Sequence, residues 1–491
     1  MATMTTPRPS RRAVLQAGVL GVGGSTLGLL NRGVSPPRRI VAPAPSGLPE
    51  IQFDIARFVA PAELIDGTLF RFGPVYAGFR PGRLRRTPTR DDQRVLATAL
   101  GEIEAAYPFR PEGAFVSVSY GRAYFDRLPG ALVADHLPRL VSNETRPAFE
   151  EARPAPTDVS PSNPGVTKRR FTLPVQIESH DLLMTVRSDS SDIVLDILGW
   201  LAGSDRLAGR TRRSPAVTEL VEWASTRLMF NRRGLPRLLA NSLRLPFASR
   251  IHPDSPMWMS FADQQLDASA PADVVTFAGS PVARLTTARP DDYFALGSVQ
   301  HLSHLIQDLD QFYFGETGEP DADDQETYFQ RVQYMFRSTP PPARGRPDQL
   351  RDGGGPAFLP NKFLGVRDAE RGARGDGTPE GVRRIGHVTA LQRSSRATDG
   401  TPLHLRVDGP GFDALDVPDG SRQPKLHFSM YVPTADLFDR MRRDGAAVDL
   451  ARRHGVRPSD NGLERFITAT RRQNFLVPPR SVRAFPLVEL V

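Results

Sequence analysis

Apolar positions along the first half of the chain follow two alternating spacings, which predicts a succession of strands and helices. Residues 68–79 and 114–124 have the composition of strands, and residues 180–188 form a third run of this kind. Helical spacing of apolar residues separates the first two strands at 91–106 and returns at 193–201. The order strand, helix, strand, strand, helix favours an α+β layer with antiparallel pairing.

The second half of the chain repeats this pattern. Residues 425–432 alternate as a strand, a helix begins at Pro433, and residues 474–477 form a closing strand. We also expect a helix after Ser298 that leads into 308–312. Two split β-α-β units therefore follow one another along the chain. The predicted fold class is α+β, with two ferredoxin-like halves whose antiparallel sheets pack as in a dimeric α+β barrel.

The chain of 491 residues is long for a single core, which favours two halves. We set residues 1–45 apart as a leader and linker. The N-terminal ferredoxin-like half is expected at 46–250 and the C-terminal half at 251–491. A segment rich in Pro, Gly, Arg and Asp, 340–380, is expected to be a long surface excursion.

The N-terminal segment has the order of an export signal. Arg11 and Arg12 precede an uncharged, glycine-rich stretch over 13–30, and small residues at 42–44 offer a cleavage site. The alternative is a chance arginine pair ahead of a membrane anchor, but the stretch is short and glycine-rich for a spanning helix. We therefore expect export by the twin-arginine translocase and an extracellular, periplasmic or cell-envelope location.

Composition excludes several kinds of site. The chain has no cysteine, which excludes disulfides, thiolate metal ligands and a cysteine nucleophile. Its net charge of +8 comes almost entirely from arginine, because only three of the 63 basic residues are lysine. The arginines are scattered among aspartates, and no nucleic-acid motif accompanies them. We therefore expect no nucleic-acid partner.

Six segments match, in order, the motifs of one known family. The strand and helix at 179–201 and the ending Phe475-Leu-Val-Pro-Pro are similar to characteristic segments of that family. Four other segments lie between them. Residues 256–264 correspond to the family's distal G-x-x-D-G motif, and residues 297–312 correspond to the segment before its proximal histidine. Gly386-His387-Val388 corresponds to the proximal histidine itself, and Leu403-His404-Leu405-Arg406 corresponds to the distal arginine. From about residue 65 onward, the chain thus resembles the dye-decolourising (DyP-type) haem peroxidases.

The resemblance implies an enzyme that uses hydrogen peroxide to oxidise an external reducing substrate, with haem b as cofactor in the C-terminal half. It makes His387 the iron ligand. It makes Asp263 the group that moves a proton, and Arg406 the group that stabilises charge as the O–O bond separates. Arg393 would pair with a haem propionate. Trp258 is either a core residue or a route for electrons, and the family commonly assembles, so a homo-oligomer is expected.

The chain also departs from the family pattern. Ser260 and Gln264 replace the two glycines of the distal motif, and Thr389 stands where an arginine is usual. Glycine permits a positive φ or a close backbone approach, and the replacements add side chains at those positions. An alternative function is therefore a non-catalytic secreted protein that binds haem or another ligand on the same scaffold.

Two further possibilities have weaker support. His301 and His304 are a rival metal pair on one face of the expected helix, but the sequence offers no convincing third ligand. A secreted hydrolase lacks support because the chain has neither a G-x-S-x-G elbow nor an H-E-x-x-H motif.

Overall fold

The structure is a computed structural model, and it describes residues 47–61, 63–65, 68–152, 166, 168–215, 217–260, 269–279, 284–315, 364–376, 381–391, 393–397 and 400–491. The predicted export signal lies outside these residues, as do Asp263 and Gln264. Among the helices in the described part of the chain, none is both long and apolar enough to cross a membrane.

The N-terminal half is a four-stranded antiparallel unit with two crossing helices. Its elements are, in chain order, β3 (Tyr76–Leu84), α2 (Arg90–Ala106), β4 (Phe115–Gly121), β8 (Leu182–Ser188), α5 (Ser191–Leu201) and β12 (Arg227–Phe230). The strands lie in the order β12-β3-β8-β4. This is the arrangement of a split β-α-β, or ferredoxin-like, unit.

The C-terminal half repeats this arrangement. Its main elements are β13 (Ser298–Gln307), α8 (Leu309–Phe314), β14 (Leu405–Arg406), β15 (Gly409–Asp413), β16 (Gln423–Val432), α13 (Asp436–Ala446) and β17 (Ile467–Val477). Strand β13 is central, β17 and β16 flank it, and β14 and β15 pair with β16. The predicted fold class, α+β with two ferredoxin-like halves, is therefore confirmed.

The two halves share one sheet. Strand β17 pairs with β4 through Phe475 opposite Gly121, which joins the halves into an eleven-stranded sheet. At the other edges, β15 lies against β12. The two backbones approach closely there: a Cβ added at Gly409 would lie 2.9 Å from the carbonyl oxygen of Phe230. The close approach of these edge strands gives the sheet its barrel-like closure.

Smaller elements complete the described chain. They are β1 (Glu63–Ile65), β2 (Thr68–Phe70), α3 (Arg122–Phe125), α4 (Gly130–His136), β5 (Arg139–Leu140), β6 (Asn143–Pro147), β7 (Gln176–Ile177), β9 (Arg206–Leu207), β10 (Arg210–Thr211), α6 (Val217–Leu220), β11 (Val221–Trp223), α7 (Leu235–Ser242), α11 (Leu364–Arg374), α12 (His387–Leu391) and α14 (Val448–His454).

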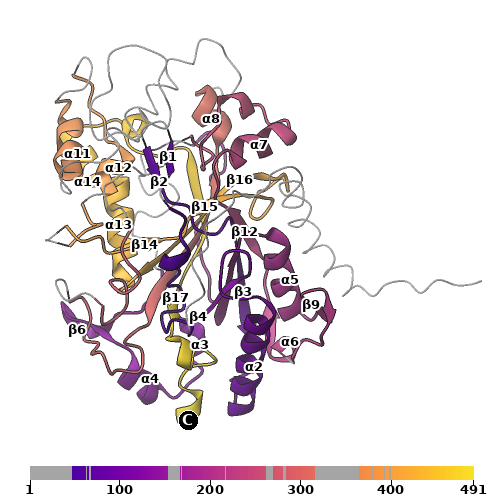
Figure 1. Cartoon of the computed structure of the whole chain (residues 1–491). Coiled ribbons are helices and arrows are strands. Elements are labelled where there is room, and N and C mark those ends of the chain that lie inside the picture. Colours follow the sequence, from indigo (N-terminus) through magenta and orange to yellow (C-terminus); the bar gives the residue numbers. More distant parts are fainter. Residues whose placement is uncertain are drawn as a thin grey trace, which may run out of the picture.

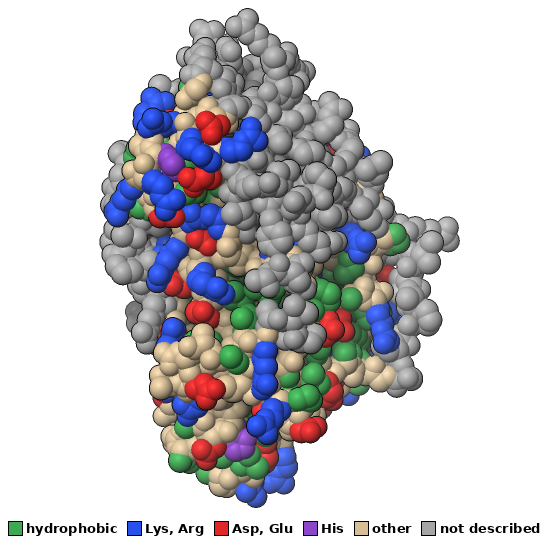
Figure 2. All heavy atoms as spheres, turned by 90° about the vertical axis from the view of Figure 1, so that its left-hand side faces the viewer, with side chains coloured by type: hydrophobic (Ala, Val, Ile, Leu, Met, Phe, Trp, Pro, Cys, Tyr) green, Lys and Arg blue, Asp and Glu red, His purple; other side chains and the backbone are tan. Residues whose placement is uncertain are grey.

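Helices cover the sheet on two sides (Figure 1). Helices α2, α5 and α6 of the N-terminal half lie on one side, and α11 to α14 of the C-terminal half lie on the other. On the second side, basic and acidic side chains are interspersed (Figure 2), and several pair along α13, such as Arg443 with Asp439 at 2.6 Å. The described residues of this face therefore carry mixed charge and no basic stripe.

Local signals explain the longest N-terminal helix. Thr89 and Asp92 form a capping box, in which each side chain accepts a hydrogen bond from the other residue's backbone N–H. Leu96, Leu100 and Ile103 are buried on its inner face. The prediction of a helix over 91–106 is confirmed by α2.

Two predicted elements were wrong. The strand expected over 68–79 is two strands, β2 and β3, because Gly73 and Pro74 interrupt the run and proline cannot donate to a ladder. The helix expected directly after Ser298 is strand β13, whose ten residues are all buried between two neighbouring strands. Of the excursion expected over 340–380, only 364–376 lie within the described residues; they contain α11, which buries Ala369 and Ala373, and the rest stays a prediction.

Candidate functional site

A cavity of about 370 Å³ lies between one face of the sheet and helices α12 and α13. Its floor comes from alternate residues of two adjacent strands, Ser303 and Leu305 of β13 and Leu426 and Phe428 of β16. Successive strand side chains point to opposite faces, so these four belong to the face that carries the cavity. The volume is in the range typical of small-molecule and cofactor sites.

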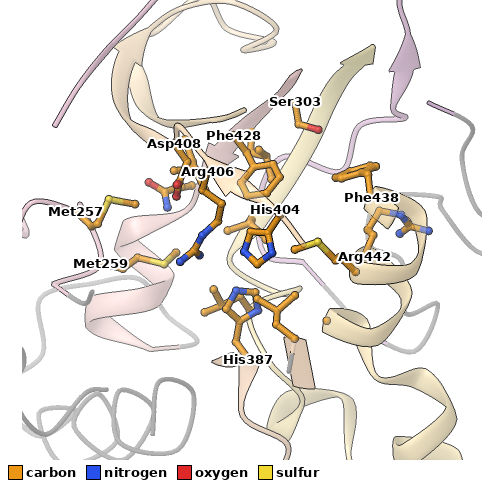
Figure 3. A pocket seen from close by; sticks show the side chains of 18 of the residues that line it. Met257, Met259, Ser303, His387, His404, Arg406, Asp408, Phe428, Phe438 and Arg442 are labelled. Atoms are coloured by element: carbon orange, nitrogen blue, oxygen red, sulfur yellow. The ribbon is translucent and has the colours of Figure 1, made fainter. Parts of the chain in front are cut away.

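One wall comes from the segment around β14. His404, Arg406 and Asp408 all line the cavity, and they are spaced two residues apart. Figure 3 shows Arg406 and His404 directed into the same space, with Asp408 behind them. An imidazole, a guanidinium and a carboxylate therefore meet on one side of the cavity.

His387 enters the cavity from the opposite side. It is the first residue of α12, is half-buried and lines the cavity together with Leu391 of the same helix. In Figure 3 its ring lies near that of His404. The structure thus brings the predicted ligand His387 and the predicted Arg406 to one site, and adds a second histidine.

The remaining walls are apolar side chains with cations among them. Methionines and aromatic residues supply most of the apolar surface, and three arginines also line the cavity: Met257, Met259, Phe428, Phe438, Met441, Arg71, Arg442 and Arg472. Apolar walls exclude water and so strengthen the interactions of the charged groups inside. The arginines suit the carboxylates of a bound ligand.

His301 supports the cavity from behind and does not line it. Its ring stacks on Phe438 with centroids 3.4 Å apart, while its nitrogens lie 2.7 Å from Asn474 Oδ1 and 2.6 Å from Ser303 Oγ. Burial lowers the pKa of His301 to about 3, so the ring is neutral at pH 7. Because β13 is a strand, His301 and His304 point to opposite faces, and the predicted shared helical face was wrong.

Ser260 adopts the backbone conformation that a glycine would favour. Its φ is 58°, in the left-handed region. Its hydroxyl accepts a hydrogen bond from the backbone N–H of His252 at 2.8 Å and lies 2.8 Å from the hydroxyl of Tyr313, which donates to the carbonyl of Trp258. These hydrogen bonds hold the serine in this backbone conformation.

The other predicted site residues lie elsewhere. Asp263 falls outside the described residues, so its position relative to the cavity stays a prediction. Arg393 follows α12 and binds Asp444 of α13 at 2.6 Å and Asp449 of α14 at 2.9 Å. Its guanidinium therefore holds these helices together. Trp258 is buried and donates from Nε1 to the carbonyl of Gly411 at 3.0 Å.

Sequence reasoning missed His404 and Asp408 as members of the site. The signal that would have found them is the two-residue spacing of His404, Arg406 and Asp408, because a strand places such residues on one face. Arg442 and Arg472 carry no comparable local signal, since they come from α13 and β17 and meet only in the folded chain.

The cavity residues fit a haem group. His387 and His404 each offer an imidazole, and imidazole is a common ligand of haem iron. The apolar walls suit the porphyrin faces, and Arg71, Arg442 and Arg472 suit its propionates.

Comparisons with known proteins give a family and several similar structures. A model described as a family of unknown function (DUF7405) matches residues 83–479. Among solved structures, the encapsulated DyP-type peroxidase from Mycobacterium smegmatis is 15% identical, with a TM-score of 0.46 over 84% of this chain and 96% of that chain. A DypB variant of Rhodococcus jostii RHA1 in complex with heme is 14% identical, with a TM-score of 0.46 over the same shares. A search of curated protein sequences found no match.

Proposed function

Because this chain belongs to the DUF7405 family of unknown function, we propose its activity from its own residues: it is an exported haem-dependent peroxidase that uses hydrogen peroxide to oxidise an external electron donor. The observation that carries the proposal is that His387 and Arg406, which match the proximal histidine and distal arginine in the sequence resemblance, line one apolar cavity. The ordered motifs from residue 65 to the C-terminus support it as well.

His387 is proposed to hold the haem through its iron. It begins a short helix that is fixed to α13 and α14 by the ion pairs of Arg393 with Asp444 and Asp449. Fixing the helix fixes the direction of the imidazole, which is the usual role of residues behind a metal ligand. Bound haem would supply the iron centre at which peroxide is reduced.

Arg406 is proposed to stabilise negative charge on the peroxide oxygens as their bond separates. A guanidinium is charged at every working pH and offers several fixed donors, and its effect is larger in a cavity with few waters. Asp263 is the proposed proton-transfer group. Asp408 is a second carboxylate that already lines the cavity, and it shares a wall with Arg406.

The export route fits this proposal. A haem inserted in the cytoplasm requires a folded protein, and the twin-arginine translocase carries folded cargo. The chain has no cysteine to oxidise after export. The partners proposed are therefore hydrogen peroxide, a reducing substrate and, transiently, the translocase.

An absorption spectrum tests the proposal. Full-length protein produced with added haem should show a Soret band and turn over hydrogen peroxide, and His387→Ala should lose the band. His404→Gln is the matched control, because it removes the other imidazole of the same cavity and should keep the band. Folded wild-type protein that takes up no haem would overturn the proposal.

The second candidate is a non-catalytic haem-binding protein, and one observation favours it. Both His387 and His404 line the cavity, and if both imidazoles held the iron of one haem, no position would remain for peroxide. In that case the wild type would bind haem with a six-coordinate, low-spin spectrum and show no peroxide turnover. His404→Gln would then change the spectrum to high-spin.

A further inference from the structure

A second polar site lies on the opposite face of the strands that floor the cavity. Ser303 of β13 and Phe428 of β16 line the cavity, whereas their neighbours His304 and His427 point into the barrel. His304 and His427 are directly opposite in the antiparallel register, and their ring centroids are 5.0 Å apart. Asp413, the last residue of β15, completes a group of three.

The three side chains present their ligand atoms to a common point. His304 Nε2 lies 3.6 Å from Asp413 Oδ1, and His427 Nε2 lies 3.6 Å from Asp413 Oδ2. One ligand atom from each residue falls within 4.8 Å of both others. A separation of 3.6 Å is too long for a hydrogen bond. It is close to the roughly 3.4 Å edge of a tetrahedron with metal–ligand bonds of about 2.1 Å.

Hydrogen bonding fixes the tautomer of His304. The Thr470 hydroxyl donates to the backbone carbonyl of His304 at 3.3 Å, so its oxygen accepts from His304 Nδ1–H at 2.9 Å. The Nε2 atom of a neutral His304 then carries a lone pair that faces the carboxylate of Asp413. Two acceptors that face each other in a buried site require a cation or a proton between them.

The imidazoles are fully buried and their inward nitrogens lack hydrogen-bond partners. Within the described residues, His304 Nε2 and both ring nitrogens of His427 make no hydrogen bond, and both residues are 0% exposed. Buried polar atoms are nearly always satisfied in proteins, so unsatisfied atoms that converge indicate a ligand. Asp413, whose side chain is 28% exposed, gives an ion access from solvent.

The carboxylate and the space beside it are also fixed. Asp413 Oδ1 accepts a hydrogen bond from the backbone N–H of Leu415 at 2.9 Å, which orients the carboxylate. An added Cβ at Gly411 would lie 2.5 Å from His427 Nε2, so glycine at this position keeps that nitrogen open.

Among the described residues, the arginines near the group pair with carboxylates other than Asp413. Arg471 binds Asp416 at 2.6 and 2.8 Å, and Arg227 binds Glu178 at 2.5 Å. Lys425 lies beside Asp413 with its Nζ 3.7 Å away, and this Nζ donates to the carbonyl of Leu415 at 2.6 Å. Two imidazoles and one carboxylate therefore offer ligand atoms to a cation, and no strong ion pair among the described residues occupies Asp413.

We propose that His304, His427 and Asp413 bind one divalent transition-metal ion of the zinc or iron(II) type inside the barrel. Two imidazoles and one carboxylate suit such ions better than Mg²⁺ or Ca²⁺, which prefer oxygen ligands. Three protein ligands leave at least one position for water or a small ligand. The site is separated from the cavity by the sheet, and the proposal does not depend on haem binding.

Cobalt(II) is the probe, because its visible absorption reports the number and type of its ligands. Full-length protein is treated with a chelator, freed of it and titrated with CoCl₂, and binding is followed by absorption and calorimetry. We expect one Co²⁺ per chain with a four- or five-coordinate spectrum, and a melting temperature raised by the ion. Asp413→Asn and His427→Gln should each lower the affinity at least tenfold.

Two control variants locate the ion. His301→Gln removes a buried histidine from the same strand but from the opposite face, and His387→Ala removes a histidine of the cavity; both should bind Co²⁺ as the wild type does. Asp413→Asn is nearly isosteric and partly exposed, so it keeps the test valid if His427→Gln fails to fold. Absence of Co²⁺ binding by folded wild-type protein, or unchanged binding by Asp413→Asn, would overturn the proposal.

Discussion

His304 lies directly opposite His427 across the β13–β16 pair, with ring centroids 5.0 Å apart, while the adjacent Ser303 and Phe428 face the other way. One pair of strands therefore supports two chemical environments. The outer face forms the floor of an apolar cavity, and the inner face holds two buried imidazoles beside a carboxylate. The two-residue alternation of strands produces this separation without any extra element.

Replacement of Lys425 by methionine should strengthen metal binding at the inner site. Its ammonium is 3.7 Å from Asp413 and competes with a metal ion for that carboxylate. Loss of one positive charge at this distance is expected to raise the Co²⁺ affinity about tenfold, or about 1.4 kcal/mol. Calorimetric titration measures the change. Arg440→Met, on the exposed side of α13, is the control for the loss of one charge; equal effects of the two variants would contradict the prediction.

Replacement of Arg406 by leucine should slow peroxide turnover and leave haem binding intact. A donor that acts on charge formed during the reaction typically contributes about 10²–10³ in rate. The Soret band reports the bound haem, and stopped-flow mixing with hydrogen peroxide reports the rate. Arg406→Lys should recover part of the rate, because it restores the charge without the planar donors. A rate equal to the wild type in Arg406→Leu would show that the guanidinium takes no part.

Substitutions of Ser260 should reveal its backbone strain. Ser260→Ala removes the acceptor for the His252 N–H and keeps a Cβ at φ 58°, so we expect a loss of about 2 kcal/mol in the free energy of unfolding. Ser260→Gly loses the same hydrogen bonds but relieves the strain, so it should be more stable than the alanine variant by about 1 kcal/mol. Urea denaturation measures both.

Ser255 provides the matched pair for this experiment. Its hydroxyl accepts from the backbone N–H of Met257 at 3.1 Å, and its own φ is not in the left-handed region. There the alanine variant should be at least as stable as the glycine variant. The same order at both positions would argue against strain at Ser260.

Replacement of Glu178 by glutamine should destabilise the protein near neutral pH and have less effect in acid. Burial opposes ionisation of Glu178, but hydrogen bonding by His180 and the charge of Arg227 outweigh it and lower its pKa to about 2. The carboxylate therefore contributes stability above its ordinary value of 4.5, and this contribution is lost as the pH falls toward 2.

The expected difference in the free energy of unfolding is about 3 kcal/mol at pH 7, because the variant leaves Arg227 buried without its charge partner. The difference should shrink between about pH 4.5 and 2, since the wild type loses the same interaction by protonation. Denaturation at a series of pH values checks this. A gap that stays constant across this range would mean that Glu178 is not ionised in the native state.

Local sequence signals predicted the fold class because they act within single elements. The helix at 91–106 and the strand at 425–432 appear as α2 and β16 with small changes at their ends. Strand β13 was missed because all ten residues are buried and six of them are polar, which hides the alternation of apolar and polar positions. His301 and His304 are three residues apart, which is also the spacing of residues on one face of a helix, so the segment was predicted to be helical.

The candidate sites were predictable only in part. His387 and Arg406 came from motif order, and the two-residue spacing would have added His404 and Asp408. The group of His304, His427 and Asp413 depends on the register of β13 with β16 and of β15 with β16. Strand register is a long-range property that no segment of the sequence specifies alone.

Strand β17 is the last strand in the chain, and it lies between β4 and β13 at the junction of the two halves. The N-terminal half therefore keeps an uncovered sheet edge until β17 has been synthesised. Such edges invite pairing with other chains, and pairing between distant segments is slow. Joining of the two halves thus waits for β17, and during that period a chaperone that shields β4 would raise the yield of folded protein.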